Sequence, residues 1–117
     1  MTVRIHDLLE YVRNGRVMDA MNEFYAADVV MSEPAYGATE GLDANLVREQ
    51  QFVDSVAEFK AFEAPVVAVD GHTSMYQNVM DWRGTDGKDY HVEQVVVAEW
   101  NDEGKIVRER FYYDRAE

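Results

Sequence analysis

Two glutamates stand where a carboxylate could carry out acid-base chemistry. Glu33 ends a short run of strand-forming residues, and Pro34 directly after it favours an extended backbone at Glu33. Glu109 shares one face of a C-terminal strand with Val107 and Phe111. Burial raises the pKa of a carboxyl group, and a carboxylate tuned in this way can move a proton to or from a carbon acid. The competing interpretation leaves Glu33 exposed at a strand end and Glu109 in contact with water at the open end of the sheet.

The pairing of the last two predicted strands places an amide near Glu109. If residues 101–104 form a four-residue hairpin turn, Val96 lies opposite Glu109 and Gln94 lies opposite Phe111. Gln94 and Glu109 are then diagonal neighbours, about 7–8 Å apart. Polar groups held together in apolar surroundings are typical of a ligand site.

Metal and cofactor sites have little support in the sequence. The chain has no cysteine, which excludes disulfides, thiol nucleophiles and thiolate ligands. Its three histidines, His6, His72 and His91, are scattered without the spacing of metal ligands. We therefore expect neither a bound metal nor a cofactor.

Length and charge limit the classes of partner. A chain of 117 residues has the length of one domain, so we expect a single domain over 1–117. The formal charge of −12 repels phosphate backbones and anionic lipid headgroups, which argues against nucleic acid and membrane partners. No window reaches the roughly 18 apolar residues of a membrane span, and the first residues lack the apolar core of a signal peptide. These features predict a soluble, cytoplasmic protein.

The elements that must position the two glutamates fall into a helical first half and a strand-rich second half. Apolar residues at helical spacing predict helices over 5–12, 17–25 and 42–56, with Gly15 ending the first. Residues 29–31 form a brief strand, and 35–41 are expected to be loop. From Phe59 onward, turn signals at hairpin intervals predict long, bent antiparallel strands. This order predicts an α+β domain.

The second face of the last hairpin suggests a protein interface. Val95 and Val97 lie on it between Glu93 and Glu99, and in the predicted pairing each glutamate is diagonal to an arginine, Arg110 or Arg108. An exposed apolar patch framed by paired charges is typical of an interface, so we expect a homodimer through this face. The alternative is that the two valines are separately exposed and are present only because valine has a high β-strand propensity.

The order of these elements resembles the nuclear transport factor 2-like superfamily, in particular its SnoaL-like branch. The resemblance covers essentially the whole chain and rests on MSEPAYGATEG at 31–41, on GKIV at 104–107 and on Trp100 before the last turn. It implies a cone-shaped, curved antiparallel sheet wrapped around the N-terminal helices, which is a cystatin-like α+β roll. It also implies a pocket at the wide end of the cone and a homodimer through the outer face of the sheet.

The superfamily includes ketosteroid isomerase, polyketide cyclases, epoxide hydrolases and dehydratases, so its chemistry is carried over residue by residue. Glu33 matches the general-base carboxylate of the isomerase, which is also followed by proline, and Tyr11 resembles its oxyanion-hole tyrosine. Val96 stands in the place of the second oxyanion donor, where a valine donates no hydrogen bond. The acid that the cyclases use on the last strand falls near Phe111, two residues beyond Glu109.

Three functional hypotheses follow. The leading one is a protein that binds a small apolar molecule in a conical pocket. The second is an enzyme of the isomerase, cyclase or dehydratase type that uses Glu33 as general acid or base, assisted by Tyr11. The third is a homodimeric interaction module without catalysis, whose interior is filled by its own side chains. The residues expected to line the pocket are Tyr76, Asn78, Met80, Gln94, Val96, Glu109, Phe111 and Tyr113.

Overall fold

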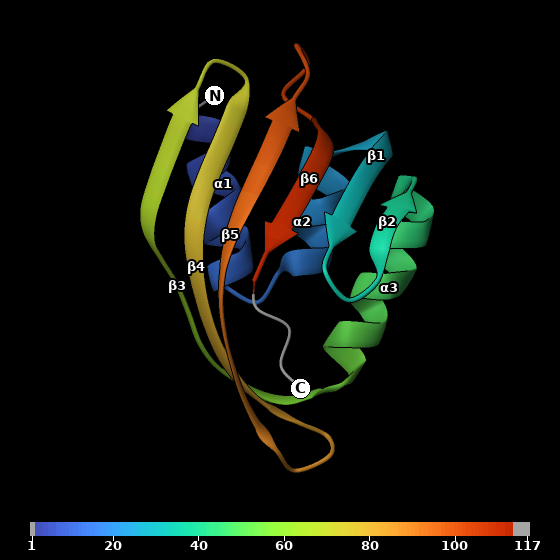
Figure 1. The fold of residues 1–117 in the computed structure, drawn as a ribbon, viewed down its shortest axis with the longest axis vertical. Coiled ribbons are helices and arrows are strands. Elements are labelled where there is room, and N and C mark those ends of the chain that lie inside the picture. The colour runs from blue at the N-terminus through green and yellow to red at the C-terminus, as the bar shows by residue number, and fades with distance from the viewer. Residues whose placement is uncertain (1, 114–117) are drawn as a thin grey trace.

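The computed structural model describes residues 2–113 as three helices and six strands (Figure 1). No helix in this part of the chain is long and apolar enough to cross a membrane. The elements in chain order are α1 (Thr2–Arg13), α2 (Val17–Phe24), β1 (Tyr25–Glu33), β2 (Gly37–Glu40), α3 (Leu42–Asp54), β3 (Val56–Asp70), β4 (Thr73–Gly84), β5 (Asp89–Trp100) and β6 (Ile106–Tyr112).

The six strands form one curved sheet with the order β2-β1-β6-β5-β4-β3. All neighbours are antiparallel except β1 and β6, which run parallel, so the sheet is mixed rather than wholly antiparallel as predicted. The helices α1 and α2 lie on one face of this sheet, and α3 lies beside β1 and β2 (Figure 1). The predicted α+β class and the curved sheet around the helices are confirmed.

All three predicted helices are present, and α1 and α2 each bury an apolar stripe, whereas α3 buries only Asn45 fully. In α1, Ile5, Leu8 and Leu9 are buried. Gly15 follows with φ of +75°, a conformation that glycine adopts without steric cost, and its N–H donates to the Val12 carbonyl at 3.0 Å. The predicted end of the first helix is confirmed.

The expected loop at 35–41 is wrong in part, because residues 37–40 form the edge strand β2. This strand returns antiparallel along β1 and pairs Glu33 with Gly37 and Val30 with Glu40. Gly37 and Gly41 both have positive φ, so the turn into β2 and the start of α3 use conformations that favour glycine. A four-residue strand with half its side chains polar gives only a weak alternation signal, and turn residues flank it on both sides.

The pairing of β5 with β6 differs from the prediction by two residues, one at the turn, where Trp100 pairs with Ile106 rather than with Lys105, and one at a bulge. Glu99 pairs with Arg108 but Trp100 pairs with Ile106, so Val107 is an extra residue on β6. Glu109 therefore lies opposite Ala98 rather than Val96, and Gln94 is not its diagonal neighbour. The sequence pattern placed Ile106 on the outer face, but the bulge turns it into the core, where it is fully buried.

The core lies between the sheet and the helices α1 and α2. Its aromatic centre is Phe24, which meets Tyr11 and Trp100 edge to face. The indole of Trp100 donates to the buried Ser74 hydroxyl at 2.9 Å, so its polar atom is satisfied. The other large buried residues around Phe24 are Ile5, Leu8, Leu9, Met21, Val29, Val96 and Ile106.

Two alanine variants separate the bulged register from the predicted one. Ile106→Ala removes a fully buried side chain, and we expect it to lower the free energy of unfolding by about 2–5 kcal/mol. Val107→Ala truncates a half-buried side chain, and we expect a cost of about 1 kcal/mol or less. Urea denaturation of both variants measures the difference. In a register without the bulge, Val107 would face the core, and the order of the two costs would be reversed.

Candidate functional site

The inward face of the sheet, meaning the face turned toward the helices, carries the candidate polar residues. Along β4, the side chains of Ser74, Tyr76 and Asn78 are buried, whereas the alternating Met75 and Gln77 are exposed. The two sides of this strand looked similar in sequence, because both mix polar and apolar residues. The structure places Tyr76 and Asn78 on the inward face, as expected for pocket residues.

Glu109 is a fully buried carboxylate on the inward face. The Tyr25 hydroxyl donates to its Oε1 atom at 2.5 Å, while Oε2 has no hydrogen-bond partner. Burial raises the pKa of Glu109 to about 7; the hydrogen bond from Tyr25 opposes this shift, and the nearby charge of Glu49 adds to it. Glu109 can therefore hold or release a proton near neutral pH.

Two tyrosines surround this carboxylate as neutral phenols. Burial, followed by the charge of Glu109, raises the pKa of Tyr25 and of Tyr76 well above the ordinary value for a phenol. Burial also raises the pKa of Glu49 on α3. The result is an acid-phenol cluster, which we define as Glu109, Tyr25, Tyr76 and Glu49.

The sequence did not single out Tyr25 as a polar partner. Its position after Phe24 made it look like the end of an apolar helical stripe, but it begins β1 and pairs with Ile106. Its contact with Glu109 joins residues 84 positions apart. Only the parallel pairing of β1 with β6 brings them together, and no local pattern reports such a pairing.

Asn78 and Gln94 form a second polar pair on the inward face. They lie opposite each other on β4 and β5, and Gln94 Nε2 donates to Asn78 Oδ1 at 2.8 Å. The Asn78 amide nitrogen is buried and has no hydrogen-bond partner. An orphaned buried donor is costly, so this atom marks a place where a ligand or a water could accept a hydrogen bond.

Glu33 is held by three groups at the end of β1. The Tyr113 hydroxyl donates to Oε2, the Tyr36 backbone N–H donates to Oε1 at 2.6 Å, and the Arg48 guanidinium lies 3.6 Å from Oε1. Burial and then the hydrogen bond to Glu33 raise the pKa of Tyr113 to about 12. The structure thus brings Tyr113 and Glu33 together, and both oxygens of Glu33 are engaged.

Tyr11, the proposed partner of Glu33, packs in the core between α1 and α2. Its ring meets Phe24 edge to face at 5.3 Å, and the guanidinium of Arg16 lies over the other side at 4.5 Å. Within the described residues, no hydrogen bond joins Tyr11 to Glu33. A catalytic role for the pair stays a prediction.

The remaining predicted pocket residues follow the inward alternation. Val96 is fully buried beside Tyr76 in the neighbouring strand, and Phe111 lies opposite Val96. Met80 and Phe111 are half-buried. Residues 2–113 contain no group of histidine and carboxylate side chains that could hold a metal ion.

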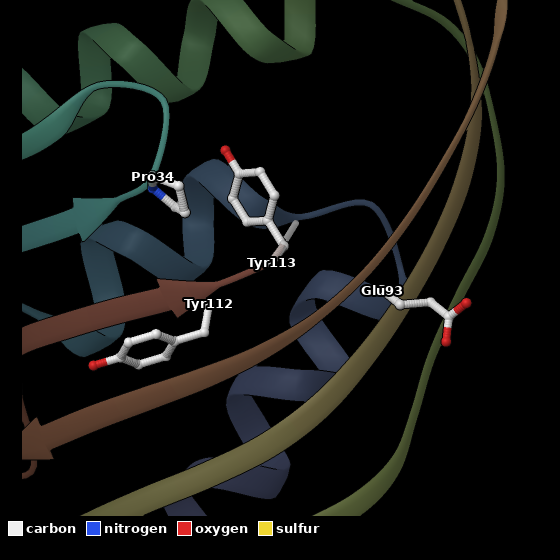
Figure 2. Close-up of a pocket in the computed structure, with 4 residues that line it drawn as sticks. All are labelled: Pro34, Glu93, Tyr112 and Tyr113. Carbon is white, nitrogen blue, oxygen red and sulfur yellow. The ribbon is translucent and has the colours of Figure 1, made fainter. Parts of the chain in front are cut away.

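Two hollows stand out on the described part of the molecule. The first, which we call the outer hollow, has a volume of about 430 Å³ and is lined by Pro34, Glu93, Tyr112 and Tyr113. Figure 2 shows the ring of Tyr113 next to Pro34, with Tyr112 pointing the opposite way. The second, which we call the aromatic hollow, has a volume of about 270 Å³ and lies against Phe52, Trp82 and Tyr90.

The sequence matches the model of the SnoaL-like domain family over residues 5–109. The chain belongs to this family. No protein of curated function matches it significantly. Solved structures share this fold. Their sequence identities to this chain are low, so the likeness establishes the fold and nothing further.

Three of these structures show how widely the fold is shared. A protein assigned as a SnoaL-like polyketide cyclase from Mesorhizobium loti superposes with a TM-score of 0.80 at 22% identity, covering 96% of this chain and 97% of its own. An NTF2-like protein of unknown function from Burkholderia pseudomallei gives 0.82 at 16%, covering 97% and 89%. TerC, co-crystallised with polyporic acid, gives 0.79 at 13%, covering 97% and 90%.

The raised pKa of Glu109 makes stability depend on pH. Between pH 4.5, the ordinary pKa of a glutamate, and about pH 7, the raised pKa of Glu109, the folded chain keeps this proton. The contribution of the neutral carboxyl to stability is therefore complete below pH 4.5 and is lost as pH rises through 7. Glu109→Gln stays neutral. From about pH 5 to about pH 8, we expect the free energy of unfolding of the variant to rise relative to the wild type by about 2–3 kcal/mol.

Urea denaturation at both pH values measures this change, and Glu103→Gln, at an exposed turn position, is the matched control. A difference between Glu109→Gln and the wild type that does not vary with pH would contradict the raised pKa.

Proposed function

We propose that this protein binds a small, largely apolar molecule between the inward face of the sheet and the helices. One observation carries the proposal: Glu109 Oε2 and Asn78 Nδ2 are both buried and both lack a hydrogen-bond partner. Each such atom costs about 1–3 kcal/mol when it is left unsatisfied. A ligand that supplies a donor to one and an acceptor to the other removes that cost.

The inward face is less buried toward one end of the sheet than toward the other, which suits a pocket with one open end. Near the turn at 101–104, the inward residues Ser74, Ala98 and Trp100 are buried. Toward the opposite turn at 84–88, the inward residues Met80, Val92, Gln94 and Phe111 are only half-buried, although Trp82, the next inward residue on β4, is buried against Phe52 and Tyr90. The half-buried end is apolar apart from Gln94, which suits entry of an apolar ligand.

The spacing of the two orphaned atoms limits the shape of the ligand. Glu109 lies opposite Ala98, and Asn78 lies opposite Gln94, four residues earlier on β5. Four residues span about 13 Å along a strand, and two strand spacings add about 10 Å across the sheet. A molecule that meets both atoms is therefore elongated, with an apolar body and a polar group at each end. The co-crystallisation of the related TerC with polyporic acid supports small-molecule binding by this fold.

Binding of an apolar dye tests the pocket. N-phenyl-1-naphthylamine is neutral and fluoresces when it leaves water, so we expect enhanced fluorescence with the wild type. Val92→Trp fills the half-buried inward face and should abolish the enhancement, while Val66→Trp, at an exposed position of β3, should retain it. Equal enhancement with both variants would contradict an inward pocket.

A second candidate function is acid-base catalysis on an apolar carbonyl compound, of the isomerase, cyclase or dehydratase type. The pKa of about 7 at Glu109 supports it, because a general base works best near the operating pH. Glu33, the residue first expected in this role, has both oxygens engaged by Tyr113, Tyr36 and Arg48. Glu109 is thus the better candidate for the proton-transferring group.

The reagent 5-nitrobenzisoxazole opens on loss of one proton and releases a coloured phenolate, so it reports any general base in an apolar site. We expect turnover by the wild type that rises with pH through about 7. Glu109→Gln should remove the turnover and Glu33→Gln should retain it. Loss in Glu33→Gln alone would assign the base to Glu33, and no turnover above buffer in the wild type would contradict catalysis by either residue.

We also propose that the outer face of the sheet forms a homodimer interface. Met75, Val95 and Tyr112 are exposed on neighbouring strands of this face, and Val95 lies directly opposite Tyr112. Arg110 is paired with Glu99 at 3.0 Å beside them, which leaves the apolar patch framed by compensated charge. A patch of this kind on a soluble protein is typical of an interface. The third hypothesis, a dimeric module without catalysis, shares this surface and differs only in having a closed interior.

The oligomeric state tests this surface. Val95→Asp places a charge in the patch and should convert a dimer into a monomer, as measured by light scattering after gel filtration. Val47→Asp introduces the same charge at an exposed position of α3 and should leave the dimer intact. A monomeric wild type would contradict the interface.

A further inference from the structure

The aromatic hollow lies apart from the acid-phenol cluster. It sits where the end of α3 meets the turn between β4 and β5, and the Thr85 N–H donates to the Ser55 carbonyl at 2.8 Å to tie the two together. This hydrogen bond joins the C-terminal end of α3 to the turn between β4 and β5, and both segments contribute to the wall of the hollow.

Three aromatic rings form most of the wall. Trp82 is buried, Tyr90 stacks on it with ring centroids 5.4 Å apart, and Phe52 meets Trp82 edge to face at 5.2 Å. The face of an aromatic ring is electron-rich and attracts cations. The hollow therefore presents a surface that favours positive charge as well as apolar groups.

One carboxylate lies at the rim and stays ionised. Asp86 accepts from the Tyr90 hydroxyl at 2.5 Å and from the Lys88 N–H at 2.9 Å, and these hydrogen bonds lower its pKa. Gly84 makes room for it, because a Cβ at that position would lie 2.6 Å from Asp86 Oδ1. The backbone of Gly84 does not have positive φ, so the close approach of Asp86 is the reason for a glycine there.

The neighbouring basic side chains leave the charge of Asp86 available to a ligand. Arg83 and Lys60 both pair with Asp89, at 3.0 and 3.1 Å. Lys88 donates its backbone N–H to Asp86, and its positive charge makes a smaller contribution to the lowered pKa of that carboxyl. No lysine or arginine lines the hollow.

We propose that the aromatic hollow binds a small alkylated ammonium ion, with its charge toward Asp86 and its methyl groups against Phe52, Trp82 and Tyr90. A primary ammonium donates three hydrogen bonds, whereas the rim offers one carboxylate, and each of its oxygens already accepts one bond and keeps only one further lone pair. An ammonium ion whose hydrogens are replaced by alkyl groups does not need these acceptors, and its alkyl groups gain contact with the rings. The volume of about 270 Å³ admits an ion of this size.

The two tryptophans provide an internal control for a binding experiment. Trp82 lines the hollow, whereas Trp100 is buried in the core and donates to Ser74. The indole N–H signals of the labelled wild-type protein, assigned with a Trp100→Phe variant, are followed during titration with tetramethylammonium chloride. Tert-butanol, which is similar in shape and neutral, is the matched probe.

We expect tetramethylammonium to shift the Trp82 signal saturably, tert-butanol to leave it unchanged, and the Trp100 signal to respond to neither. Asp86→Asn should weaken tetramethylammonium binding by about threefold, whereas Glu103→Gln, which removes one charge at the opposite turn, should not. An equal response to tert-butanol, no response to either probe, or an equal effect of the two charge variants would each overturn the proposal. These outcomes do not depend on the inward pocket.

Discussion

The buried carboxylate of Glu109 is the constraint on which the inward face depends. A charged carboxylate removed from water is costly unless it is hydrogen-bonded, and Glu109 has a single partner, the hydroxyl of Tyr25. The chain meets part of this cost by holding the proton to higher pH, which raises the pKa to about 7. A group that changes charge near neutral pH inside an apolar interior is unfavourable for stability alone. Such groups are concentrated at functional sites, which is why we propose Glu109 as the centre of the site.

The fold places Glu109 there through two departures from regular structure. The bulge at Val107 turns Ile106 toward the helices, onto the same face as Glu109, so one strand contributes a core residue and an acid to that face. The parallel pairing of β1 with β6 then brings Tyr25 to the carboxylate. Toward the other end of the sheet, Asn78 is buried next to the half-buried Gln94 and Met80, and its amide nitrogen has no hydrogen-bond partner.

Periodicity in the sequence was enough to predict the helices, the hairpin turns and the inward position of Glu109. The resemblance to the SnoaL-like branch supplied the curved sheet around the helices, which the family match bears out. The register of β6 was wrong by two residues, because the turn is one residue longer than predicted and Val107 adds one more. A shift of two leaves the inward and outward alternation of the strand unchanged, so the pattern gave no sign of it. Tyr25 was missed because its role depends on a partner 84 positions away. Glu33 drew attention through its neighbour Pro34, but two of the groups on its oxygens come from α3 and from the residue after β6, and no local pattern predicts that meeting.

The measurement that tests the central claim most directly is the titration of the Glu109 carboxyl carbon by NMR in protein labelled at glutamate side chains, with the signal assigned by its absence in Glu109→Gln. The account predicts that this carbon titrates with a midpoint of about 7, apart from the exposed glutamates of the chain. A midpoint at the ordinary value of 4.5 would mean that Glu109 reaches water, and it would contradict the buried site.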